Sequence, residues 1–210
     1  GRLGTSLLRA MIATHPEACV VNESHFCGAV YEKLHRQLKH TEGAQFVEEV
    51  LDYLFKLWWV QEMNLEREQV RQISLRGSGT WGDVYFALLA AAAMQQGVRI
   101  VGDKTPKHIR YIPLISDWLP RMKFIHIVRD PRAVVSSFLA TDVGPNDLAP
   151  AIDHWMKAAQ CHIQHAERLG PSRYLVVKYE ELVANSVPVL QDVCRFLGLE
   201  FDEDMMTFHE

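Results

Sequence analysis

The chain starts with a turn that contains two glycines and two hydroxyl residues and runs directly into an apolar segment. Its first residues are Gly1-Arg2-Leu3-Gly4-Thr5-Ser6-Leu7-Leu8. At the start of a helix, such a turn presents backbone N–H groups that have no helical partner, at the end where the helix dipole is positive. It therefore suits a phosphate or a sulfate, and Gly4 lets the backbone come close to the anion. An ordinary helix cap explains the turn equally well by itself, so the rest of the sequence has to decide.

Length and composition predict one folded domain over residues 1–210. Hydrophobic residues make up 48% of the chain, which is enough for a core, and charged residues make up 23%. Loops that bind phosphates normally follow a buried strand. Because the sequence begins within the loop, we expect that a strand upstream of Gly1 is missing.

Charge and cysteine content argue against several classes of protein. The formal net charge of -4 argues against a nucleic-acid-binding protein, which usually has an excess of basic residues. The longest apolar stretch, residues 86–94, is too short to cross a bilayer. The four cysteines form no CxxC pair and no histidine cluster has the spacing of metal ligands, so we expect free thiols and no metal site. Free thiols fit a reducing compartment, which predicts a cytoplasmic protein.

Short apolar segments alternate with helical ones along the chain. Four of them predict strands at residues 18–21, 98–102, 123–128 and 174–177. The spacing of apolar residues predicts helices at residues 5–14, 26–40, 44–75, 83–96, 107–118, 131–139, 149–168 and 188–197. This alternation indicates an α/β fold with a central parallel sheet, in which residues 28–97 form a helical insertion.

Polar side chains follow each predicted strand. The pairs are Asn22-Glu23, Asp103-Lys104, Arg129-Asp130 and Lys178-Tyr179. In parallel α/β sheets, ligands bind outside the carboxyl ends of the strands, and the opening loop belongs to the same edge. We therefore expect these residues to share one binding site. Arg129 is of special interest, because its planar guanidinium matches a phosphate, although an ion pair with a neighbouring carboxylate would be its purely structural role.

Three segments, in this order, resemble the signature segments of the sulfotransferases that use 3′-phosphoadenosine-5′-phosphosulfate (PAPS). They are the opening loop, Val128-Arg129-Asp130-Pro131-Arg132 through Ser136-Ser137, and Val177-Lys178-Tyr179-Glu180-Glu181-Leu182-Val183. The resemblance is to the Golgi-type and bacterial branch, which includes the tyrosylprotein sulfotransferases, and it covers the chain from residue 1 to about residue 202, apart from residues 28–97. It implies a single sulfotransferase domain with a P-loop-like three-layer αβα fold. It also implies a loop that closes over the nucleotide, which we expect to be missing beyond Glu210.

The resemblance implies which residues bind the donor PAPS and its product, adenosine 3′,5′-bisphosphate. The opening loop would hold the 5′-phosphosulfate, with the candidates Arg2, Leu3, Gly4, Thr5, Ser6 and Leu7. Arg129 and Ser137 would hold the 3′-phosphate, and Tyr179 would lie near the adenine. Leu3 departs from the family, in which serine is frequent at this position, so one hydroxyl contact is lost.

For catalysis, the resemblance implies in-line transfer of a sulfuryl group to a hydroxyl acceptor, with a carboxylate as the base and no metal. Glu23 lies where the tyrosylprotein sulfotransferases have their catalytic glutamate, and a carboxylate beside an alcohol can accept its proton. His25 is the rival base, because many cytosolic sulfotransferases use histidine. Arg2 and Lys104, the latter in the segment Asp103-Lys104-Thr105-Pro106, would stabilise the charge that develops during transfer.

The acceptor is left open by the sequence, and so is the oligomeric state. His25 stands where the tyrosine-directed enzymes have arginine, which argues against an acidic peptide. The helices of residues 28–97 carry the adjacent Trp58 and Trp59, and we expect them to shape a pocket for an apolar or amphipathic acceptor. A small molecule, a carbohydrate, and a lipid-like or carrier-bound group are all compatible with this pattern.

Two other functions compete with sulfotransfer. A P-loop nucleoside or nucleotide kinase has the same architecture, but its Walker A loop needs a lysine before the Ser or Thr, and Gly4-Thr5-Ser6 has none. Asp103 and Asp130 are the nearest candidates for the Mg²⁺ carboxylate of such a kinase. The non-enzymatic alternative is a catalytically inactive nucleotide-binding or scaffold domain with the same fold.

Overall fold

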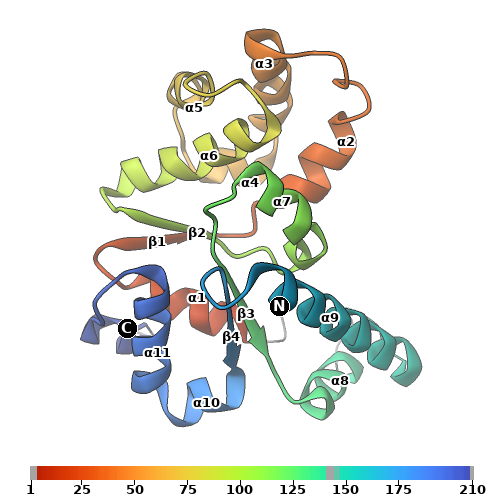
Figure 1. Cartoon of the computed structure of the whole chain (residues 1–210), viewed down its shortest axis with the longest axis vertical. Coiled ribbons are helices and arrows are strands. Elements are labelled where there is room, and N and C mark those ends of the chain that lie inside the picture. Colours follow the sequence, from red (N-terminus) through yellow and green to blue (C-terminus); the bar gives the residue numbers. More distant parts are fainter. Residues whose placement is uncertain (1–3, 141–144, 146, 209–210) are drawn as a thin grey trace. The chain divides into compact units, whose positions relative to one another are not determined.

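The structure, a computed structural model, describes residues 4–140, 145 and 147–208 of the chain (Figure 1). The chain forms two compact units. The first consists of Gly1–Met11 and Arg121–Glu210, and the second of Ile12–Pro120. Among the described residues, each unit contains one pair of hydrogen-bonded strands.

The second unit contains strands β1 (Ala18–Val21) and β2 (Ile100–Asp103), which run parallel and side by side (Figure 1). Val21 pairs with Asp103, so both strands end at the same edge. Helices connect the two strands: η1 (Phe26–Tyr31, a π-helix), α2 (Glu32–Leu34), α3 (Gly43–Leu54), α4 (Trp58–Glu62), α5 (Arg67–Ser74) and α6 (Trp81–Gln96). After β2 come η2 (Pro106–Tyr111, a 3-10 helix) and α7 (Ile112–Trp118).

Helix α6 supplies much of the core of this unit. Thr80 and Asp83 form a capping box at its start, and Gly97 ends it in the left-handed conformation. The helix packs against α5, α7, β1 and β2. Most of its side chains are therefore buried, including the large side chain of Tyr85, which is 1% exposed.

The prediction of one continuous helix over residues 44–75 is wrong. The buried face of α3 ends at Leu54, and Leu57 is extended before α4 begins. A continued helix would place Trp58, four residues after Leu54, on the buried face. Instead, the break buries Trp59, which is 7% exposed, and leaves Trp58 65% exposed. A second break follows at Asn64, whose φ of 51° lies in the left-handed region that asparagine tolerates.

The first unit contains β3 (Phe124–Val128) and β4 (Tyr174–Lys178), which are also parallel. Helix α1 (Thr5–Ala13) begins in this unit. Its other helices are α8 (Pro131–Leu139), α9 (Leu148–Leu169), α10 (Tyr179–Ala184), α11 (Ser186–Leu197) and the 3-10 helix η3 (Glu203–Met206). Helix α9 packs against α8 and β4, and α11 packs against β4 (Figure 1).

The parallel α/β class that the sequence predicts is confirmed. All four predicted strands form, and the described strands hydrogen-bond as two parallel pairs, β1 with β2 and β3 with β4. Within residues 4–140, 145 and 147–208, no helix combines the length and the apolarity that crossing a membrane requires.

Candidate functional site

The described part of the opening turn consists of Gly4 and the start of α1. Gly4 has a φ of 87°, which residues with a side chain rarely adopt. A Cβ atom on Gly4 would lie 2.7 Å from Cε2 of Tyr179 and 3.2 Å from Cδ1 of Ile127, so only glycine fits. The candidates Arg2 and Leu3 lie outside the described residues.

The hydroxyl of Thr5 is buried at the N-terminus of α1 and has no hydrogen-bond partner among the described residues. An unpaired buried polar group costs about 1–3 kcal/mol, and such a group in a native structure calls for an explanation such as a ligand that supplies the partner. The first N–H groups of α1 also lack helical partners and lie at the positive end of the helix. Ser6 is exposed and Leu7 is half-buried. Gly4 and Thr5 together fit an anion such as a phosphate or a sulfate.

Arg129 and Tyr179 follow β3 and β4 directly, and the strand register brings them side by side. Val128 pairs with Lys178, and the guanidinium carbon of Arg129 lies 4.4 Å from the centroid of the Tyr179 ring. This cation–π contact orients the guanidinium. Because Gly4 packs against the same ring, Tyr179 links the opening turn to Arg129.

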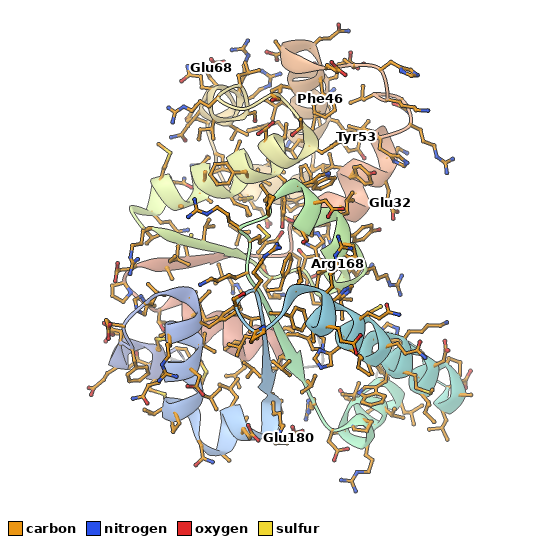
Figure 2. All side chains as sticks on the ribbon, viewed as in Figure 1. Glu32, Phe46, Tyr53, Glu68, Arg168 and Glu180 are labelled. Atoms are coloured by element: carbon orange, nitrogen blue, oxygen red, sulfur yellow. The ribbon has the colours of Figure 1, made fainter. Side chains whose placement is uncertain are left out.

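Further contacts define the edge of the β3–β4 pair. Glu180, labelled in Figure 2 at the start of α10, accepts a hydrogen bond of 2.9 Å from the Asp130 N–H. Hydrogen bonds from Arg132 lower the pKa of Asp130 to about 2. Arg132 is 90% exposed, however, so this ion pair adds little stability. Ser137 is half-buried in α8, about two helical turns after Arg129.

In the second unit, Glu23 and Lys104 follow β1 and β2 and form an ion pair. Oε1 of Glu23 lies 2.8 Å from Nζ of Lys104, and Oε2 lies 3.5 Å from Nε2 of His25. The Lys104 side chain is 14% exposed and that of Glu23 is 31% exposed. Burial disfavours the ionised form of Glu23, but the hydrogen bond and the charge of Lys104 outweigh it, so the pKa of Glu23 is lowered. Glu23 is therefore a carboxylate at neutral pH.

A buried network surrounds the carboxylate of Asp103, whose side chain is 4% exposed. Asp103 accepts hydrogen bonds from the hydroxyls of Ser24, Tyr85 (2.9 Å) and Thr105 (2.7 Å). Nδ1 of His108 lies 3.5 Å from the same carboxylate. Burial, followed by the charge of Asp103, raises the pKa of Tyr85 well above its usual value, and burial lowers the pKa of His108.

Sequence reasoning missed this network. It placed Asp103 at the expected binding edge and considered it as a possible ligand of Mg²⁺ in a kinase, but it assigned no hydrogen-bond partners to Asp103 and no role to Tyr85. One signal was present: the hydroxyl of a tyrosine within a buried helix needs a hydrogen-bond partner. The identity of that partner depends on tertiary packing, which brings α6 beside the end of β2.

The two units offer different chemistry. In the first, Gly4, Thr5 and Arg129 offer backbone N–H groups, a hydroxyl and a guanidinium to an anion. In the second, Glu23 and Lys104 offer a proton acceptor and a cation. Across the described parts of the chain, no group of three or more His, Cys, Asp or Glu side chains is arranged so that it could hold a metal ion.

The chain is similar to protein-tyrosine sulfotransferases along its whole length. It is 25% identical over 221 residues to protein-tyrosine sulfotransferase A of Caenorhabditis elegans, and this alignment covers 100% of this chain and 50% of the relative. It is 24% identical over 220 residues to protein-tyrosine sulfotransferase 2 of Gallus gallus, and this alignment covers 100% of this chain and 52% of the relative. The chain thus spans about half the length of the curated relatives that it matches.

Solved structures of sulfotransferase domains have a similar fold. The domain from the Synechococcus PCC 7002 olefin synthase has a TM-score of 0.69 and 28% identity, over 100% of this chain and 74% of that chain. The domain from the curacin biosynthetic pathway has a TM-score of 0.65 over 100% of this chain and 75% of that chain, and at 21% identity it shows the fold alone. Both likenesses confirm the P-loop-like α/β fold class.

The expected cytoplasmic location is wrong. The relatives are protein-tyrosine sulfotransferases, enzymes of the Golgi-type branch that the sequence motifs resemble. The four cysteines are free, and Cys19, Cys27 and Cys194 are buried, as expected of buried free thiols, whereas Cys161 is partly exposed. Burial raises the pKa of each of the three buried thiols. Buried thiols with a raised pKa react slowly in any compartment, so they do not identify the location.

The family comparison covers nearly the whole chain. The model of the sulfotransferase family matches residues 1–203. The matched range includes the opening turn, the ends of all four strands and the helices between them. The chain therefore belongs to the sulfotransferase family.

Proposed function

We propose that the chain transfers a sulfuryl group from PAPS to a hydroxyl acceptor. The observation that carries the proposal is the hydroxyl of Thr5, which is buried without a partner at the N-terminus of α1, beside Gly4. This atom needs a hydrogen-bonding ligand, and its surroundings favour an anion. Membership of the sulfotransferase family makes the 5′-phosphosulfate of PAPS the expected anion. The same membership leaves the kinase alternative without support.

In this proposal, residues of the first unit bind the donor. Thr5 and the free N–H groups of α1 hold the 5′-phosphosulfate, and Arg129 holds the 3′-phosphate with help from Ser137. Tyr179 keeps the guanidinium of Arg129 in place through the contact at 4.4 Å. Arg2, Leu3, Ser6 and Leu7 stay sequence predictions for the same loop.

Residues of the second unit serve the transfer step. PAPS supplies the activated sulfuryl group. As the acceptor oxygen bonds to sulfur, the bond between sulfur and the phosphate oxygen of the nucleotide breaks, and the acceptor proton passes to Glu23. Lys104, with Arg2 as the sequence predicts, stabilises the negative charge on the transferring group and the leaving oxygen. The lowered pKa of Glu23 keeps it ionised at neutral pH and therefore ready to accept the proton. His25, 3.5 Å from Glu23, remains the rival base.

The acceptor proposed first is the hydroxyl of a peptidyl tyrosine. The relatives matched over the full chain are protein-tyrosine sulfotransferases. A second, shorter match is to carbohydrate sulfotransferase 5 of Mus musculus, 28% identical over 46% of this chain. A sugar hydroxyl is therefore the second acceptor to test.

The proposal is tested by replacing the unpaired hydroxyl with a methyl group of the same shape. Thr5→Val should leave the free protein at least as stable as the wild type, because it removes an unsatisfied buried group worth about 1–3 kcal/mol. The affinity for adenosine 3′,5′-bisphosphate, measured by calorimetry, should nevertheless fall by about tenfold, because one hydrogen bond to a charged group is lost. Thr5→Ser keeps the hydroxyl and should keep most of the affinity.

Two results would contradict the proposal. One is a wild-type protein that does not bind adenosine 3′,5′-bisphosphate and transfers no sulfuryl group from PAPS to a tyrosine peptide or a sugar. The other is a Thr5→Val variant that binds the nucleotide as tightly as the wild type, which would remove the observation that carries the proposal.

A further inference from the structure

We infer that the hydrogen bond from Ser24 to Asp103 positions Glu23 against Lys104, so that Ser24 and Asp103 are positioning residues for the transfer step. This inference rests on the proposed function and deepens it. Neither residue needs to touch the donor or the acceptor. Each acts through its neighbour in the sequence, because Glu23 precedes Ser24 and Lys104 follows Asp103.

The backbone hydrogen bonds between the two strands stop just before the ion pair. The last ladder pair is Val21 with Asp103, and the Lys104 N–H donates one more hydrogen bond of 3.2 Å to the carbonyl of Val21. Beyond this point, side chains join the two segments among the described residues. Apart from the ion pair itself, these contacts are the bond from Ser24 to Asp103 and a bond of 3.4 Å from the His25 N–H to the Thr105 hydroxyl.

Ser24 is well placed to hold the segment that carries Glu23. It is fully buried, at 0% exposure. Its hydroxyl donates to Asp103 and accepts a hydrogen bond of 3.3 Å from the Phe26 N–H at the start of η1. The next residue, His25, has a φ of 49°, a left-handed conformation that costs free energy in a residue with a side chain. Such a conformation persists where contacts on both sides impose it.

Asp103 is the fixed end of this contact. Its carboxylate is buried, its backbone pairs with Val21 in the strand ladder, and the Thr105 hydroxyl donates to Oδ1, the carboxylate oxygen that Ser24 and Tyr85 do not use. A buried charge that is hydrogen-bonded from several sides has little freedom to move. Ser24 therefore bonds to a rigid partner. Because Glu23 is next to Ser24 and Lys104 is next to Asp103 in the sequence, this bond also fixes the position of Glu23 relative to Lys104.

Tyr85 provides the matched control. Both the Ser24 hydroxyl and the Tyr85 hydroxyl donate to Oδ2 of Asp103. Ser24→Ala and Tyr85→Phe each remove one of these two hydrogen bonds. The first removal releases the segment that carries Glu23, whereas the second leaves that segment untouched. A merely structural role would give the two variants the same phenotype.

The experiment compares the two variants with PAPS and a tyrosine-containing peptide as probes. Both should lower the melting temperature by a similar amount, and both should bind adenosine 3′,5′-bisphosphate within about twofold of the wild type. Only Ser24→Ala should lower kcat, by about 10–100-fold, without a matching change in the KM for PAPS, because misplacing a reacting group by about 1 Å costs up to about 100-fold. Ser24→Cys keeps the size of the side chain and serves if the alanine variant does not fold.

A double-mutant cycle separates positioning from other effects. If Ser24 acts through Glu23, adding Ser24→Ala to Glu23→Gln should lower kcat by less than about twofold. Losses that multiply in the double mutant would overturn the inference, and so would equal kcat values for Ser24→Ala and Tyr85→Phe in an active enzyme. Those two results leave the proposed function intact, whereas a wild-type protein that transfers no sulfuryl group overturns both.

Discussion

Gly4→Ala tests the contact between the opening turn and Tyr179. An alanine here would have to keep a φ of 87°, and a left-handed conformation costs an L-residue about 1–2 kcal/mol. Its Cβ would lie 2.7 Å from Cε2 of Tyr179 and closer still to Cδ2. The ring would have to move, and overpacking of this kind costs about 1–3 kcal/mol. The free energy of unfolding should therefore fall by about 2–5 kcal/mol.

Gly198→Ala isolates the contribution of the contact. Gly198 has a φ of 81°, close to that of Gly4, but apart from its chain neighbours no atom of the described residues lies within 4 Å of its Cβ position. This variant bears the conformational cost without the clash, so its free energy of unfolding should fall by only about 1–2 kcal/mol. Urea unfolding of both variants measures the difference. In a Tyr179→Ala background, where the ring is absent, the cost of Gly4→Ala should drop towards the value for Gly198→Ala, with only the contact at 3.2 Å to Cδ1 of Ile127 left to accommodate.

The clash should also weaken nucleotide binding. A displaced Tyr179 ring no longer supports the guanidinium of Arg129, which lies 4.4 Å from the ring centroid. We expect calorimetric binding of adenosine 3′,5′-bisphosphate to weaken by about tenfold or more in Gly4→Ala, equivalent to about 1.4 kcal/mol, and to stay unchanged in Gly198→Ala. The reasoning is refuted if the two glycine variants unfold with the same free energy and bind the nucleotide equally well.

Glu23→Gln keeps the shape of the side chain but removes the proton acceptor, so kcat should fall by about 100-fold or more while calorimetric nucleotide affinity is retained; normal turnover would make His25 the base. Arg129→Ala should raise the Kd for adenosine 3′,5′-bisphosphate by about 10–100-fold, with partial recovery in Arg129→Lys, and an unchanged Kd would remove Arg129 from the site. Burial and then the charge of His162 lower the pKa of His126 to about 4. The unfolded chain therefore binds the proton first, and stability should fall as the pH drops from about 6.5 to about 4. In His126→Phe, the fall in the free energy of unfolding between about pH 6.5 and about pH 4 should be smaller by on the order of 3 kcal/mol, as measured by urea unfolding. An unchanged pH dependence of the unfolding free energy would contradict the assignment.

The ends of the strands are the part of the candidate site that the sequence predicts well. Glu23, Lys104, Arg129 and Tyr179 each follow a short apolar segment, and the length of that segment marks where the strand stops. In a parallel pair, both strands then end at the same edge. This rule places Glu23 near Lys104 and Arg129 near Tyr179, and the structure adds how they meet, in an ion pair at 2.8 Å in the second unit and a cation–π contact at 4.4 Å in the first.

The sequence alone does not predict contacts that depend on how helices and strands pack against each other. The helical spacing of apolar residues over residues 44–75 predicts a buried helix face, but it does not show where one helix ends and the next begins. The helix is interrupted because a single helix that buries Leu54 would also bury Trp58. A new helix, turned differently about its axis, buries Trp59 and exposes Trp58. Tyr85 likewise belongs to a helix whose central part is apolar, and only the packing of α6 against β2 shows that its hydroxyl reaches Asp103.

The register between β1 and β2 decides whether the ion pair can form. A shift of one residue would move Asp103 away from Val21 and turn the side chains of the shifted strand to the opposite face. It would separate Ser24 from Asp103 and, with them, Glu23 from Lys104. Each strand has only four residues, so backbone hydrogen bonds alone specify this register weakly. The buried hydrogen bond that Ser24 donates to Asp103 adds specificity, because a shifted pairing would not bring this hydroxyl to the carboxylate. The Ser24–Asp103 contact that positions Glu23 therefore also favours the strand pairing on which Glu23 depends.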